Sequence, residues 1–70
     1  MMPLSLVGAG EENTIKKIGG SPEVRQHLEN LGFVVGGNVT VITTLAGNVI
    51  VNVKEVRVAI SQEMANKIMV

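Results

Sequence analysis

The chain has 70 residues, of which 46% are hydrophobic, and six lysines and arginines balance six glutamates to give a net charge of zero. This length corresponds to one domain, near the smallest size at which a core is stable without cross-links. With no cysteine and one aromatic residue, the composition excludes disulfides and thiolate metal sites and disfavours nucleic-acid binding through stacking or a basic patch.

The first part of the chain predicts two short strands. Residues 4–6 read Leu-Ser-Leu, an alternation typical of a strand with one apolar face. Residues 8–10 then turn the chain. Residues 13–18, in which Ile15 and Ile18 are apolar, form the second expected strand.

The most clearly marked element is a helix over residues 21–31. Ser21 offers an N-cap hydroxyl, and Pro22 suits the first helical position because its missing N–H has no partner there. The spacing i, i+4, i+7 predicts one buried face formed by Val24, Leu28 and Leu31. Gly32 supplies the left-handed residue of a Schellman motif, which packs Phe33 back on Leu28.

The next part of the chain predicts three strands joined by tight turns. Residues 39–44 are rich in β-branched side chains, and residues 49–53 and 56–60 have an apolar residue at every second position. The connecting turns are residues 45–48 and 54–55. Simple alternation in the first strand places Val39, Val41 and Thr43 on one face and Thr40, Ile42 and Thr44 on the other.

These elements predict a mainly β fold with short helices. Ser61 is expected to cap a short helix over residues 62–67, and residues 68–70 form a last strand. A sheet this small protects its apolar side most simply by curling, so we expect one domain, residues 1–70, folded as an SH3-like barrel of five to six strands with the long helix plugging one end. The predicted core consists of Leu4, Leu6, Ile15, Ile18, Leu28, Leu31, Phe33, Val39, Val41, Val51, Val53, Val58, Ile60, Ala65 and Ile68.

Few side chains offer chemistry. His27 is the only histidine, and Glu23 one turn earlier makes a Glu-x-x-x-His pair with one oxygen and one nitrogen for a divalent metal. Two ligands do not make a site, so a partly exposed helical histidine is the favoured interpretation. Glu11 and Glu12 are expected in a solvated loop rather than in a cation or acid–base site. Because the chain has no Asp and no Cys, we predict that it is not an enzyme.

Two further features leave alternatives open. Gly19 and Gly20 precede the helix as phosphate-binding glycines do, but the lysine and spacing of a P-loop are absent, and turn glycines are the favoured interpretation. Met64 and Met69 flank the second helix, where they serve either packing or contact with a partner.

A partner surface is the remaining hypothesis. Arg25 and Glu29, four residues apart, form either a surface ion pair or a contact with a partner. Leu45 in its turn and Ile50 on the outward side of its strand either pack on the barrel or form a small apolar patch. The predicted partner-binding residues are therefore Arg25, Glu29, Leu45 and Ile50. Unpaired edge strands also leave weak self-association open.

The order of these features resembles the FeoA family over essentially the whole chain. The resemblance is carried by Leu4-Ser5-Leu6, by Ile18-Gly19-Gly20, by Arg25-x-x-Leu28-x-x-Leu31-Gly32-Phe33-x-x-Gly36-x-x-Val39-x-Val41, and by residues 49–54 followed by Val58-Ala59-Ile60, Ala65 and Ile68-x-Val70. Two positions depart from the family pattern: Val35 stands where proline is frequent, and Glu55 where glycine is frequent. Glu55 implies either a turn without a positive φ there or a strained one.

The resemblance implies a small cytoplasmic accessory protein of bacterial ferrous iron uptake. Its partner would be the cytoplasmic domain of the membrane transporter FeoB. The protein would be associated with the membrane only through this partner. The alternative is a transition-metal-binding sensor module, similar to the C-terminal domain of diphtheria-toxin-repressor-type regulators, with Fe²⁺, Zn²⁺ or Mn²⁺ held by Glu23 and His27. No stretch approaches the roughly 18 apolar residues of a membrane span, which also favours a soluble cytoplasmic protein.

Overall fold

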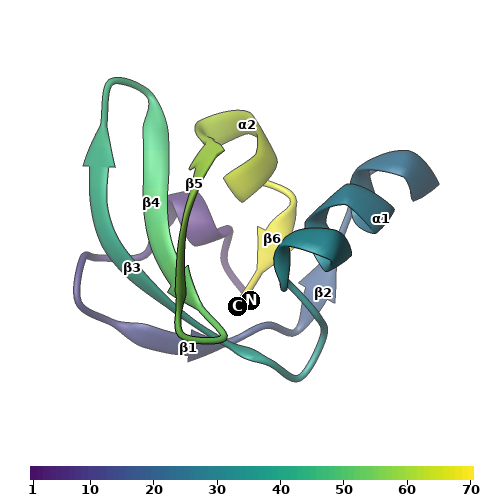
Figure 1. Ribbon diagram of the computed structural model, residues 1–70, viewed down its shortest axis with the longest axis horizontal. Helices are drawn as coiled ribbons and strands as arrows, with labels where there is room; N and C mark the ends of the chain where they lie inside the picture. The colour runs from purple at the N-terminus through teal and green to yellow at the C-terminus, as the bar shows by residue number, and fades with distance from the viewer.

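The strands form two antiparallel sheets that curl around one core (Figure 1). The computed structural model describes all 70 residues. Its larger sheet has the order β1-β3-β4-β5 and consists of β1 (Glu12–Thr14), β3 (Asn38–Leu45), β4 (Asn48–Val53) and β5 (Val56–Ser61). The smaller sheet pairs β2 (Lys17–Ile18) with β6 (Ile68–Met69). The predicted mainly β fold is confirmed.

The two ends of the chain close the barrel beside each other (Figure 1). Met2 and Val70 exchange backbone hydrogen bonds in both directions, each with an N···O distance of 2.9 Å. Pro3 also forms an isolated bridge with Met69. The N-terminal segment therefore continues the smaller sheet past β6.

The core contains 15 buried hydrophobic residues in one cluster, and no polar residue is buried. Leu31 and Val58, both predicted as core, are only half-buried against this cluster. Val49 and Val70 belong to it although they were not predicted. The predictions that the structure confirms are Leu4, Ile15, Ile18, Leu28, Phe33, Val39, Val41, Val51, Val53, Ile60, Ala65 and Ile68.

The predicted strand at residues 4–6 is wrong, because these residues form a 3₁₀ helix, η1 (Leu4–Leu6). Leu6 N–H donates to the Pro3 carbonyl at 3.0 Å, and Val7 N–H donates to the Leu4 carbonyl at 3.1 Å. With three residues per turn, Leu4 and Val7 lie on the same side. Val7 is therefore buried, and Leu6, predicted as core, is 67% exposed.

The predicted strand at residues 13–18 divides into β1 and β2, which belong to different sheets. The chain crosses between the sheets at Ile15 and Lys16. Ile15 N–H donates to the Gly37 carbonyl, and Lys16 N–H donates to the Met69 carbonyl, each at 2.8 Å. Ile15 and Ile18 nevertheless both face the core.

Both helices begin where the sequence predicts. In α1 (Pro22–Leu31), Ser21 Oγ accepts a hydrogen bond from Val24 N–H. In α2 (Gln62–Ala65), Ser61 Oγ accepts one from Met64 N–H. The second helix is two residues shorter than the predicted range of 62–67, since residues 66 and 67 form a turn.

The end of α1 has the predicted Schellman arrangement. Gly32 has a φ of 110°, in the left-handed region that favours glycine. Its N–H donates to the carbonyl oxygens of both Leu28 and Glu29, and Phe33 N–H donates to the Leu28 carbonyl at 3.0 Å. Phe33 and Leu28 are both completely buried. The only aromatic ring thus closes the end of the helix against the core.

A β-bulge in β3 overturns the predicted alternation. Val41 pairs with Val51, but Thr43 pairs with Ile50, so Ile42 has no cross-strand partner. Residues beyond the bulge change face, because antiparallel partners lie on the same side of a sheet. Thr43 therefore shares the outer face with Ile50 instead of the inner face with Val41.

The turn at Lys54 and Glu55 is strained. The two residues have φ values of 50° and 64°, the type I′ conformation that favours Asn-Gly or Gly-Gly. Replacing Glu55 by glycine is therefore expected to raise the free energy of unfolding by about 1 kcal/mol. Urea denaturation measures the change, with Glu55→Ala as the matched control. Alanine keeps the Cβ, so an equal gain in both variants would show that the carboxylate, not the backbone, is the cause.

Candidate functional site

The outer face of the β3–β4 hairpin carries an exposed apolar patch. Leu45 at the end of β3 pairs with Asn48, and the outer-face residue two positions further along β4 is Ile50. Leu45 and Ile50 are thus diagonal neighbours, about 7–8 Å apart between their Cα atoms. Leu45 is 64% exposed, Ile50 is half-buried, and the bulge residue Ile42 is 36% exposed. We call Ile42, Leu45 and Ile50 the hairpin patch.

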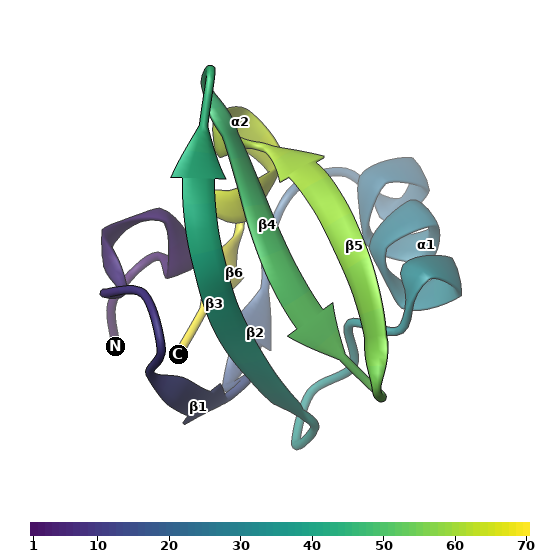
Figure 2. The same cartoon turned by 60° about the vertical axis from the view of Figure 1, so that its left-hand side comes forward.

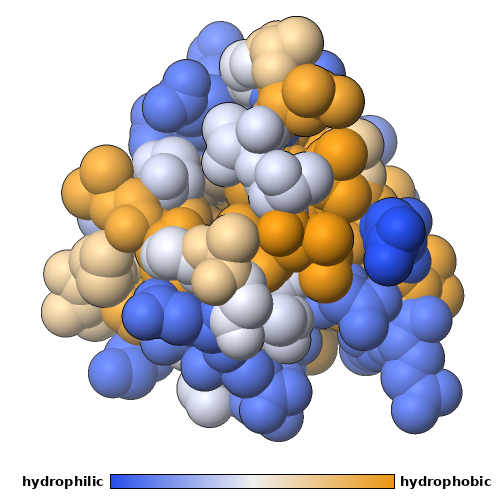
Figure 3. Space-filling view, turned by 90° about the vertical axis from the view of Figure 1, so that its left-hand side faces the viewer, coloured by the Kyte–Doolittle hydropathy of each residue, from blue (hydrophilic) through white to orange (hydrophobic).

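The surroundings of the hairpin patch are polar. Along the outer face, Thr40, Asn52 and Arg57 form the next cross-strand row. Figure 2 shows β3, β4 and β5 side by side, and Figure 3 shows hydrophobic surface running down from the hairpin tip between white and blue atoms. The structure therefore brings together two residues predicted for partner binding, Leu45 and Ile50, and adds Ile42, which lies at the bulge.

The other two predicted partner-binding residues lie on a different part of the molecule. Arg25 and Glu29 are exposed on α1. The same helix has a side-chain hydrogen bond from Gln26 Nε2 to Asn30 Oδ1 at 3.1 Å. Both ribbon views place α1 on the side of the barrel away from the tip of the β3–β4 hairpin (Figures 1 and 2). The structure thus separates Arg25 and Glu29 from the hairpin patch.

The candidate metal ligands Glu23 and His27 are both exposed on α1. No group of three or more His, Cys, Asp or Glu side chains is close enough to hold a metal ion. Of the acidic pair near the N-terminus, Glu11 accepts a hydrogen bond from Gly8 N–H at 3.3 Å. Metal binding through Glu23 and His27 stays a prediction.

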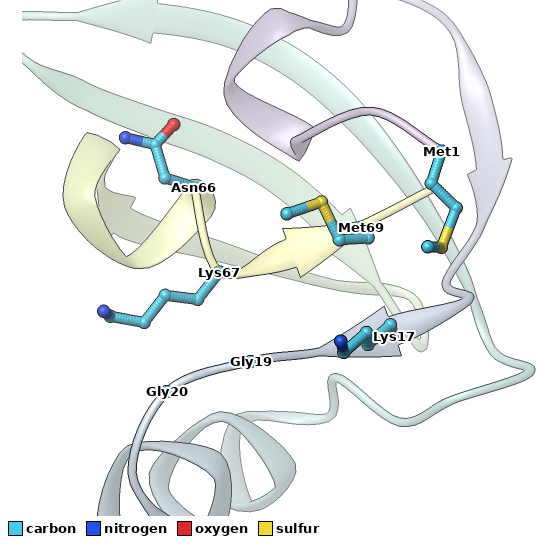
Figure 4. Close-up of a pocket in the computed structure, with 7 residues that line it drawn as sticks. All are labelled: Met1, Lys17, Gly19, Gly20, Asn66, Lys67 and Met69. Atoms are coloured by element: carbon cyan, nitrogen blue, oxygen red, sulfur yellow. The ribbon is translucent and has the colours of Figure 1, made fainter.

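A pocket of about 450 Å³ lies between β2 and the segment that joins α2 to β6 (Figure 4). Sequence reasoning missed it because its walls come from the two ends of the chain. Met69 lines this pocket, whereas Met64 packs partly against the core. The residues around the pocket are Met1, Lys17, Gly19, Gly20, Asn66, Lys67 and Met69.

Fold and surface together define a small SH3-like barrel without a helix long and apolar enough to cross a membrane. Residues 2–70 match the model of the FeoA domain. The chain therefore belongs to the FeoA family, a family of small accessory and regulatory domains associated with ferrous iron transport. The resemblance seen in the sequence is confirmed.

Solved structures agree with this assignment. A crystal structure of an iron uptake regulatory protein (FeoA) has a TM-score of 0.90 and 32% identity, covering 97% of this chain and 90% of that one. The solution structure of FeoA from Chlorobium tepidum has a TM-score of 0.88 and 26% identity, covering 97% and 67%. A manganese-dependent transcriptional repressor shares the fold at 19% identity, with a TM-score of 0.86 over 94% of this chain and 38% of the repressor. A comparison with curated proteins gave no match.

The exposure of Leu45 predicts that its side chain contributes little to stability. Leu45→Gln is expected to change the free energy of unfolding by less than about 0.5 kcal/mol. Val49→Ala, in the same hairpin but 2% exposed, is expected to cost about 2 kcal/mol. Urea denaturation of both variants tests this difference. A loss in Leu45→Gln as large as that in Val49→Ala would mean that Leu45 packs onto the barrel and is not a free surface residue.

Proposed function

We propose that the protein is a cytoplasmic accessory protein of ferrous iron uptake, and that its hairpin patch docks on the cytoplasmic domain of a FeoB-type transporter. Membership of the FeoA family supports the transport role. The observation that carries the docking surface is Leu45, 64% exposed at a hairpin tip and diagonal to Ile50 on the same face.

The make-up of the surface suits a transient contact. An apolar centre with a polar rim is the usual anatomy of a protein interface. Here the centre is the hairpin patch, and the rim includes the row of Thr40, Asn52 and Arg57. A patch of three side chains corresponds to an interface at the small end of the range, below about 1,200 Å² of total buried area. Such an interface is typical of a regulator that binds its partner transiently.

The face of α1 that carries Arg25 and Glu29 is the second candidate surface. A partner that contacts both surfaces has to extend around the barrel, because α1 lies away from the hairpin tip (Figure 1). Arg25→Gln therefore separates the two surfaces in the same binding experiment. A loss of affinity in this variant alone moves the proposed contact from the hairpin patch to α1.

The experiment is a titration of the isotope-labelled protein with the transporter's cytoplasmic domain, with and without guanine nucleotide. Amide shifts are expected to cluster at Ile42, Thr43, Leu45 and Ile50. Leu45→Gln is expected to weaken binding about tenfold, the scale of one lost apolar side chain at an interface centre.

The matched control is Val35→Gln. Val35 is 65% exposed, as Leu45 is, but it precedes the opposite end of β3, roughly 20 Å or more away along the strand. Binding by this variant is expected to equal that of the unmodified chain. Equal losses in Val35→Gln and Leu45→Gln, or no binding by the unmodified chain in either nucleotide state, would overturn the proposal.

A further inference from the structure

The pocket between β2 and the α2–β6 segment concentrates positive charge in a chain of zero net charge. Lys17 reaches it from β2, and Lys67 from the turn after α2, while no acidic side chain lines it. Figure 4 shows the side chain of Lys67 running along the Gly19-Gly20 segment, with Lys17 at the other end of that segment. Two ammonium groups thus flank one stretch of glycine backbone.

Gly20 is required for this arrangement. It has a φ of 93°, and a Cβ at this position would come within 2.9 Å of Lys67 Cδ and 3.2 Å of Val24 Cγ1. Because Gly20 lacks a side chain, the stem of Lys67 lies directly against the backbone of Gly20 at the edge of the pocket. The N–H of Gly20 donates to no carbonyl among the turn and loop hydrogen bonds. It is an available donor beside the two lysines.

Asn66 also lines the pocket, and its Oδ1 accepts a hydrogen bond from the Ser5 hydroxyl. The rest of the lining is apolar, from Met1 and Met69 (Figure 4). The pocket therefore offers several donors, two positive charges and an apolar wall, and it offers no carboxylate to repel an anion.

We propose that this pocket binds a phosphoryl group carried on a small organic molecule or a lipid headgroup. A lysine ammonium is a compact point charge with three donors, and lysine is a common phosphate ligand in proteins. The volume of about 450 Å³ falls in the range of small-molecule pockets, and the methionine wall accepts the carbon part of a phosphate ester. This site lies on a different sheet from the hairpin patch, and its occupancy does not depend on the proposed partner.

The first experiment titrates the isotope-labelled full chain with inorganic phosphate and with glycerol 3-phosphate at constant ionic strength. Saturable shifts are expected at the amides of Gly19, Gly20, Asn66 and Lys67. Lys17→Gln and Lys67→Gln are each expected to weaken binding about tenfold, the scale of one charged hydrogen bond. The matched control is Lys16→Gln, because Lys16 carries the same charge next to Lys17 but does not line the pocket.

The second experiment distinguishes the sources of the phosphoryl group. The chain is sedimented with phosphatidylcholine vesicles that contain or lack phosphatidic acid. Retention only on phosphatidic acid, lost in Lys17→Gln and kept in Lys16→Gln, identifies a lipid headgroup, and saturable binding of glycerol 3-phosphate without retention identifies a small phosphorylated molecule. The proposal is overturned if neither ligand engages the pocket, or if Lys16→Gln loses as much binding as Lys17→Gln. Lys17 is exposed, so its variant keeps the test valid even if Lys67→Gln fails to fold.

Discussion

The burial of Phe33 and Leu28 in one cluster at the end of α1 is the constraint on which the rest of the barrel depends. Both side chains are completely buried, and Phe33 is the only aromatic residue. A chain of this size has a total stability of about 4–10 kcal/mol, and a buried phenylalanine alone accounts for about 3–5 kcal/mol when it is truncated. The segment that follows Phe33 is hydrogen-bonded to Ile15. Gly36 N–H donates to the Ile15 carbonyl, and Ile15 N–H donates to the Gly37 carbonyl. The end of the helix therefore also holds the crossing from β1 to β2.

The bulge at Ile42 determines what the barrel shows to its surroundings. With simple alternation, Leu45 would share the inner face with Val39 and Val41. The extra residue moves Leu45 to the outer face, beside Ile50. Bulges also increase strand twist and disturb edge pairing, so one inserted residue both curves the sheet and exposes an apolar hairpin tip. The core still has an apolar side chain at this level of the hairpin, because Val49 of β4 is buried on the inner face opposite Thr44.

The sequence predicted those elements whose signals are local. The caps at Ser21 and Ser61, the helix end at Gly32 and the turn at residues 54–55 each depend on a few adjacent residues, and all are present. The 3₁₀ turn at residues 4–6 was missed because three residues cannot distinguish a period of two from a period of three. Its hydrogen bonds and the docking of Val7 into the core decide between them.

The features that the sequence did not predict depend on register or on contacts between distant residues. No residue type marks the bulge at Ile42; only the pairing of β3 with β4 reveals it. Simple alternation already places Ile42 on the outer face but places Leu45 on the inner one, so only the register shift shows that the two share a face. The pocket joins Lys17 with Lys67, residues near opposite ends of the chain, and it exists only because the termini close the barrel together.

Helix α2 lies between the hairpin patch and the pocket. At its beginning, Gln62 N–H donates to the carbonyl of Gly47 at 3.0 Å, in the turn next to Leu45. At its end, Asn66 and Lys67 contribute to the pocket. Ala65, fully buried between them, fixes the helix to the core. A four-residue helix has too few internal hydrogen bonds to be stable by itself, so its position depends on both ends. The same short helix therefore supports the hairpin turn at one end and contributes to a wall of the pocket at the other.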